Sequence, residues 1–243
     1  MPLHDWSQVP AGLFHHFHQV WSVSIARALN RGVLPTELTA LVEQRAGTVE
    51  SDVLAIEEAL NDTRFSGGAA VLDKPQTRFV RQTEKHFYAD KANRIVIRHH
   101  LGKVVALIEI VSPGNKDGNR AIRQFVQKVT DALYQGIHVL VIDVFPPGKR
   151  DPHSLHELIW NELDDEEFSL PSPQDRLLAS YETGSVQSAY IETMGVGSPL
   201  PDMPLFIASG THVLTPLEST YQDAWQDTPE SVRRLVQGGS KSA

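Results

Sequence analysis

The chain contains no cysteine among its 243 residues. This absence excludes disulfide bonds, thiolate zinc sites and catalysis by a cysteine nucleophile, so any metal ion would need Asp, Glu, His or main-chain oxygen ligands. No apolar run approaches the roughly 18 residues of a membrane span, and the start of the chain lacks the basic and apolar segments of a secretory signal. We therefore expect a soluble, cytoplasmic protein with no membrane partner.

Several common catalytic signatures are also missing. The sequence has no glycine-rich dinucleotide loop after a strand, no Walker loop, no serine-hydrolase elbow and no HExxH zinc motif. Its hydrophobic fraction of 41% and charged fraction of 21% are typical of a globular protein, and 243 residues suffice for one large α/β domain or a core with extensions. The sequence does not indicate an oligomeric state.

The net charge of −8 conceals a strong segregation of charge. Residues 74–128 hold 12 Lys and Arg against four Asp and Glu, whereas residues 151–230 hold 15 Asp and Glu against Arg176 alone. The basic segment 74–128 could bind nucleic acid. Alternatively, the acidic third of the chain packs against this segment and neutralises it.

Periodicity of apolar residues predicts an α/β fold with a mixed central sheet. The expected elements are helices over 13–29 and 121–134 and strands over 39–45, 51–57, 94–100, 103–111 and 138–145. Their order reads as a helix, a three-strand meander, a crossover helix and a strand. We expect the strands over 103–111 and 138–145 to be adjacent and parallel at the sheet centre, because both are almost continuously apolar.

The domain organisation follows from these elements. Residues 1–150 are expected to form the α/β core. Residues 151–237 are expected to form an elaboration that packs on the core, with a helix over 155–163 followed by strands and turns. Residues 238–243 are expected to be a flexible tail.

One acidic residue interrupts an apolar strand. Glu109 lies within Val104–Val111 and shares a face with Leu107 and Val111 by the period of two. Carboxylates are rarely buried unless they are paired or bind a metal ion. Glu109 is therefore a candidate site residue, and Lys116, which follows the turn after this strand, is a candidate cation beside it.

Asp52 is the second candidate carboxylate, at the start of an expected strand. Two carboxylates on neighbouring strands, within about 6 Å of each other, can hold one Mg²⁺ or Mn²⁺ that activates a water, while Lys116 stabilises developing charge. Structural alternatives remain open. Glu109 could pair with Arg98 or Arg94 across the hairpin, Asp52 could be a turn residue, and Lys116 could simply be solvated.

Histidines and a further aspartate offer weaker signals. The pairs His15/His18 and His153/His156 have helical i,i+3 spacing, which is compatible with a divalent metal site but more often reflects polar faces, caps and packing. Asp143 is another acid within the second apolar strand. It could support the metal site indirectly or pair with Arg150, and we favour the structural role.

Motifs spread along nearly the whole chain carry a family resemblance. The segments HDWSQVPAG, FHHFH, IEIVSPGNK, PLPDMPLF and PLEST start at residues 4, 14, 108, 199 and 216. They resemble the domain-of-unknown-function family numbered 4058, which implies kinship but no activity. The core of that family in turn resembles, more distantly, the PD-(D/E)xK restriction-endonuclease-like superfamily.

The superfamily resemblance implies a Mg²⁺-dependent nuclease site. Asp52 would be its first acid and Glu109 its second, both as metal ligands. Val111 stands where the motif has its lysine, so the resemblance requires a lysine recruited from elsewhere, either Lys116 or the helix residue Lys128. Two functions follow: a metal-dependent nuclease with a degenerate site, or a catalytically inactive module that binds nucleic acid or protein on the same fold.

Overall fold

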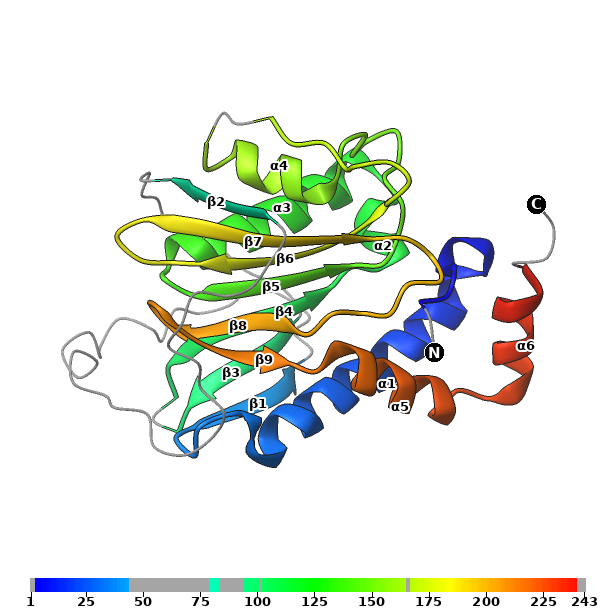
Figure 1. The fold of residues 1–243 in the computed structure, drawn as a ribbon, viewed down its shortest axis with the longest axis horizontal. Helices are drawn as coiled ribbons and strands as arrows, with labels where there is room; N and C mark the ends of the chain where they lie inside the picture. Colours follow the sequence, from blue (N-terminus) through cyan, green and yellow to red (C-terminus); the bar gives the residue numbers. More distant parts are fainter. Residues whose placement is uncertain (1–2, 44–78, 84–93, 101, 165–166, 240–243) are drawn as a thin grey trace.

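A computed structural model describes residues 3–43, 79–83, 94–100, 102–164 and 167–239. Its centre is a mixed seven-stranded sheet with the strand order β1-β3-β4-β5-β6-β7-β2 (Figure 1). The strands are β1 (Leu38–Glu43), β2 (Phe79–Thr83), β3 (Arg94–His99), β4 (Val104–Ile110), β5 (His138–Asp143), β6 (Arg176–Glu182) and β7 (Gln187–Met194). Strands β8 (Met203–Ala208) and β9 (Thr211–Thr215) form a separate hairpin.

The expected centre of the sheet is confirmed. Strands β1, β3 and β4 pair antiparallel in that order, and β4 pairs parallel with β5 through the crossover helix α3 (Asn119–Tyr134). Every residue of β4 and of β5 is buried, because helices and the hairpin cover both faces of the sheet. Gly136 ends the helix in the left-handed region, at φ +71°, as its lack of a side chain allows.

Two apolar layers hold the sheet. On one face lie α1 (Ala11–Ala28), α5 (Leu217–Asp227) and the β8–β9 hairpin, which bury Trp21, Tyr221 and Trp225 among others. On the other face lie α3 and α4 (Leu155–Asn161), which pack around Phe125 and Trp160. In Figure 1, α4 lies at the top and α3 behind β6 and β7, whereas α1 and α5 lie at the lower right near the β8–β9 hairpin.

The C-terminal third differs from the expectation of strands and turns. Its strands β6 and β7 extend the central sheet antiparallel to β5. Two helices there, α5 and α6 (Glu230–Gly239), are absent from the sequence-based prediction, which was wrong on this point. The prolines over 199–216 favour extended chain, but Pro216 precedes the first helical residue, a position where proline does not interrupt helical hydrogen bonds.

Parts of the predicted pattern lie outside the described residues, including the expected strand over 51–57. Strand β2 was not predicted; it pairs antiparallel with β7 at the far edge of the sheet. The short elements η1 (Trp6–Gln8), η2 (Leu29–Val33) and α2 (Pro113–Lys116) complete the described part of the fold. Among the described residues, no helix is long and apolar enough to cross a membrane.

Candidate functional site

Glu109 lies on the face of β4 that α3 covers. It follows the expected alternation, because Leu107 and Val111 on the same face pack in the apolar layer with α3. Glu109 pairs in register with Val141 of β5 and is only 4% exposed. The predicted burial of a carboxylate in this strand is therefore confirmed.

Lys128 supplies the positive charge beside Glu109. Its Nζ lies 2.6 Å from Oε2 of Glu109, and Lys128 itself is only 7% exposed. The lysine belongs to the buried stripe of α3, where Phe125 and Val129 are its neighbours, and its Nζ lies 5.4 Å from the centre of the Phe125 ring. Of the two lysines considered from the sequence, Lys128 is the one that reaches Glu109.

Such a pair is difficult to explain by stability alone. Desolvation of two charges roughly cancels their attraction, so a well-packed apolar pair of the same size is often as stable or more stable. Removal of one partner, in contrast, leaves a buried charge without compensation. An ion pair kept between two apolar layers is therefore a functional candidate, with structural specificity as the alternative.

His18 approaches the same end of β4 from the opposite layer. Its Nε2 lies 3.1 Å from the carbonyl oxygen of Ile110, the residue after Glu109. Burial lowers the pKa of His18, the hydrogen bond to Ile110 opposes this shift, and the charges of His15 and Lys128 lower the pKa further. His18 was not among the predicted site residues, although its i,i+3 spacing from His15 was a signal.

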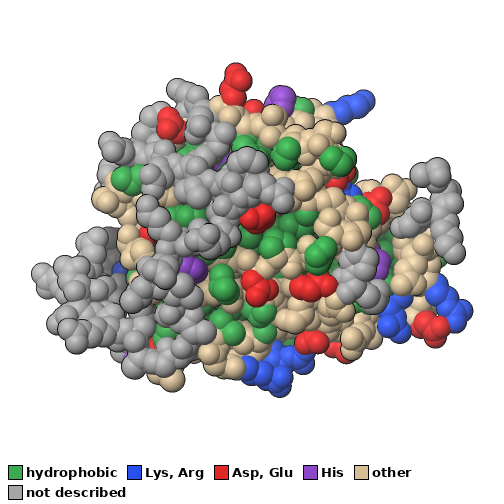
Figure 2. Space-filling view, in the orientation of Figure 1, with side chains coloured by type: hydrophobic (Ala, Val, Ile, Leu, Met, Phe, Trp, Pro, Cys, Tyr) green, Lys and Arg blue, Asp and Glu red, His purple; other side chains and the backbone are tan. Residues whose placement is uncertain are grey.

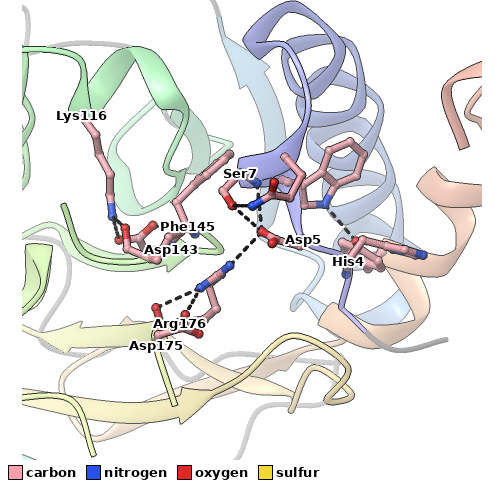
Figure 3. A network of polar contacts seen from close by, with 12 residues as sticks. His4, Asp5, Ser7, Lys116, Asp143, Phe145, Asp175 and Arg176 are labelled. Carbon is pink, nitrogen blue, oxygen red and sulfur yellow. Dashed lines mark hydrogen bonds and ion pairs between the residues drawn. The ribbon is translucent and has the colours of Figure 1, made fainter. Parts of the chain in front are cut away.

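Lys116 occupies a different position from the predicted one. Its Nζ lies 2.7 Å from Oδ2 of Asp143 and 2.9 Å from Oδ2 of Asp151, and it donates a hydrogen bond of 3.2 Å to the carbonyl oxygen of Pro146. These partners join α2 to the end of β5 and to the loop that follows it, as the left part of Figure 3 shows for Asp143. Burial raises the pKa of Asp143; the charge of Lys116 opposes this shift, and that of Asp151 adds to it.

Two of the predicted ion pairs are wrong, whereas the alternative pair between Glu109 and Arg94 stays a prediction, because the Arg94 side chain is not among those that the structure describes. Arg98 pairs with Glu43 at 2.9 Å, and not with Glu109. Asp143 pairs with Lys116, and not with Arg150. Both predictions assumed partners close in sequence, whereas the observed partners are Glu43 on the neighbouring strand β1 and Lys116 on α2, which precedes β5. Asp52 lies outside the described residues, so the expected distance between its carboxylate and that of Glu109 stays a prediction.

A second buried cation lies at the same edge of the sheet. Arg176, at the start of β6, is 2% exposed; its guanidinium contacts Asp175 at 2.6 Å and Asp5 at 3.1 Å. Asp5 also accepts hydrogen bonds from the main-chain nitrogen and hydroxyl of Ser7. Figure 3 shows the Arg176 side chain extending between Asp175 and Asp5. The sequence motif HDW thus anchors the N-terminal segment to the sheet.

Of the two metal ligands predicted from the sequence, Glu109 is the one that lies among the described residues. Within them, no group of three or more Asp, Glu or His side chains is arranged to hold a metal ion. Glu109 alone gives a carboxylate of the type that Mg²⁺ and Mn²⁺ prefer. The pair His153/His156 does not form a histidine site, because His156 is buried and its Nδ1 contacts the hydroxyl of Tyr181 at 2.8 Å.

Comparison with known proteins finds no matching family model, no similar curated protein and no similar solved structure.

Proposed function

We propose that the protein is a Mg²⁺- or Mn²⁺-dependent nuclease that hydrolyses phosphodiester bonds with Glu109 and Lys128. The ion pair of 2.6 Å between these two side chains carries the proposal. It places a lysine beside the acidic residue near the carboxyl end of β4. The superfamily motif has its lysine at the position that Val111 occupies in this chain. The order helix, antiparallel strands, helix, parallel strand also agrees with a restriction-endonuclease-like core.

Val111 explains why the lysine would come from α3. Val111 is fully buried in the apolar layer beneath this helix, so a lysine at this position would have to displace packed side chains. A lysine on α3, the helix that covers this face of β4, can reach the same carboxylate without displacing these side chains. In the proposal, Lys128 replaces the motif lysine and Lys116 keeps a structural role.

Each group has a distinct task in this proposal. Glu109 and Asp52 would hold the divalent ion, which when bound supplies a Lewis acid for the phosphoryl oxygen and the water. Lys128 would place its ammonium beside that carboxylate and stabilise the negative charge that develops on the phosphate. The His18 imidazole would hold the Ile110 carbonyl, and with it the end of β4, in position.

A second candidate function is a binding module without catalysis. The side chains of Glu109 and Lys128 are only 5% and 8% exposed, and they neutralise each other. This burial favours a protein that keeps the fold and binds nucleic acid or another protein. The two functions differ in one measurable property, because only the nuclease requires the Glu109 carboxylate for turnover.

The test is digestion of single- and double-stranded DNA and RNA with Mg²⁺ or Mn²⁺. We expect cleavage by the wild type and a loss of about 10²-fold or more for Lys128→Gln and for Glu109→Gln. Lys103→Gln, at the opposite end of β4, and Asp223→Asn, on α5, are matched controls that should retain full activity. Asp52→Asn tests the second proposed ligand, and thermal unfolding of each variant shows that it is folded.

The outcomes separate the candidates. Full activity in Glu109→Gln would contradict the proposed site. A wild type that binds nucleic acid but cleaves none of the substrates would favour the binding module. Isothermal titration with Mn²⁺ adds a readout independent of turnover: heat of binding that disappears in Glu109→Gln supports the metal site.

A further inference from the structure

Some of the positive charges of the basic segment 74–128 are neutralised by ion pairs within the protein. Three of its described cations have carboxylate partners: Arg98 pairs with Glu43, Lys116 with Asp143 and Asp151, and Lys128 with Glu109. A group that already holds a carboxylate contributes little to an external field. The surface that attracts a polyanion must therefore be built by other residues.

Four exposed cations near the carboxyl ends of β4 and β5 have no carboxylate partner within the described ranges. Arg120 and Arg123 lie in the first turns of α3, and Lys149 and Arg150 lie in the loop after β5. We call these four residues the basic edge. Two of them lie outside the segment 74–128, so the sequence average did not reveal the group.

Lys116 brings the two halves of the basic edge together. It ends α2, four residues before Arg120, and contacts Pro146 and Asp151, which flank Lys149 and Arg150 in the sequence. Because the Lys116 side chain is only 12% exposed and contacts the buried Asp151, it holds the loop beside the start of α3. Lys116 thus positions the exposed cations.

The basic edge and the first acidic residue after α4 lie at opposite ends of α3. At the far end, the hydroxyl of Tyr134 donates a hydrogen bond to the carbonyl oxygen of Glu162. A helix of 16 residues separates the two ends by about 24 Å. In the face shown in Figure 2, acidic side chains are scattered over the surface and the blue groups lie at its margins. Asp117 is an exposed acid between α2 and α3.

We propose that the basic edge binds the phosphodiester backbone of nucleic acid and so presents the strand to Glu109 and Lys128. The choice of partner rests on the proposed nuclease function, but binding itself needs no cleavage. Guanidinium groups bind phosphate in a bidentate manner, and neutralisation of phosphates releases condensed counterions. The surface lies outside the carboxyl ends of the parallel strands, where ligands bind in open α/β sheets.

The experiment measures binding of a fluorescent DNA duplex by anisotropy, without divalent ions, over a series of NaCl concentrations. We compare the wild type with Arg120→Gln/Arg123→Gln, with Lys149→Gln/Arg150→Gln and with the fourfold variant. The control is Arg31→Gln/Arg233→Gln, which removes two cations outside the basic edge. Single-stranded DNA and heparin serve as separate probes, so that a preference for the nucleic-acid backbone can be distinguished from binding of any polyanion.

Four lost phosphate contacts should reduce the slope of log K against log[salt] by about 3.6, at roughly 0.9 per contact. We expect each double variant to lose about half of this slope, the fourfold variant to bind at least about 100-fold more weakly at low salt, and the control to bind like the wild type. Unchanged binding by the fourfold variant, equal loss in the control, equal affinity for heparin, or no binding by the wild type would each overturn the proposal.

Failure of this proposal is distinguishable from failure of the nuclease function. Cleavage that depends on Glu109, together with wild-type binding by the fourfold variant, would contradict the role of the basic edge and support the nuclease function. Binding that depends on the basic edge, without cleavage of any substrate, would support the basic edge and contradict the nuclease function. Unchanged thermal unfolding of the fourfold variant confirms that its four exposed positions do not support the fold.

Discussion

The Nζ of Lys128 lies 2.6 Å from Oε2 of Glu109, although 19 positions separate the two residues in the sequence. The crossover from β4 through α3 to β5 creates this contact, because the helix packs back over the strand that precedes it. Its consequence for stability can be measured independently of any activity.

Lys128→Met should destabilise the protein by about 3–5 kcal/mol, because it removes the cation that lies 2.6 Å from the buried Glu109 carboxylate. Glu109→Leu in the same chain should recover most of this loss, because it removes the buried negative charge as well. Chemical denaturation of the two single variants and the double variant gives the coupling free energy. A coupling near zero would show that the two groups do not interact in the folded protein.

Lys116→Met should also destabilise the protein, by a similar few kcal/mol, since Asp143 and Asp151 would share a buried site without a cation. Asp143→Asn should reduce this loss, because it removes one of the two stranded charges. Lys149→Met, an exposed lysine in the adjacent loop, is the matched control and should change the free energy of unfolding by less than about 0.5 kcal/mol. Equal effects of Lys116→Met and Lys149→Met would contradict the structural role of Lys116.

His138 should make stability depend on pH. Burial lowers the pKa of His138 from 6.5 to about 3, and its Nδ1 accepts a hydrogen bond of 3.0 Å from the main-chain nitrogen of Thr183. Folding therefore favours the neutral ring, so its contribution is complete above pH 6.5 and is lost as pH falls from 6.5 toward 3. By linkage, the wild type should lose about 2 kcal/mol from this group between pH 7 and pH 5.

Denaturant unfolding at several pH values checks this expectation. His138→Asn retains an acceptor for Thr183 but cannot take up a proton, so its stability should fall less steeply with decreasing pH than that of the wild type. His153→Asn, at an exposed position, should follow the wild-type curve. Parallel curves for His138→Asn and the wild type would refute the assignment.

Tyr221→Phe should loosen the N-terminal segment. The Tyr221 hydroxyl accepts hydrogen bonds from the main-chain nitrogen of His4 and from Nε1 of Trp6, and it lies 2.9 Å from Nδ1 of His4. Loss of the hydroxyl leaves buried polar groups unpaired, at a cost of about 1–3 kcal/mol. Limited proteolysis should cut faster near the N-terminus of this variant. Tyr134→Phe, which loses one hydrogen bond nearer the surface, should behave like the wild type in both measurements.

Local periodicity was sufficient to predict the centre of the fold. The apolar runs around Glu109 and Asp143 and the amphipathic pattern between them predicted β4, α3, β5 and their parallel crossover, because a strand, a helix and a returning strand of these lengths have one favoured hand. The helix α5 was missed. Its buried residues Leu217, Tyr221 and Ala224 do have helical spacing, but the preceding prolines favoured an extended interpretation.

The apolar neighbours of Glu109 and the period of two suffice to predict a carboxylate in a buried strand. They do not predict that Lys128, and not Lys116, lies beside it. The rotation of α3 about its axis selects which side chain faces β4, and the two carboxylates that bind Lys116 come from the end of β5 and from the loop after it. The contacts of Lys128 and of Lys116 both depend on packing between elements that are distant in the chain, which local sequence patterns do not predict.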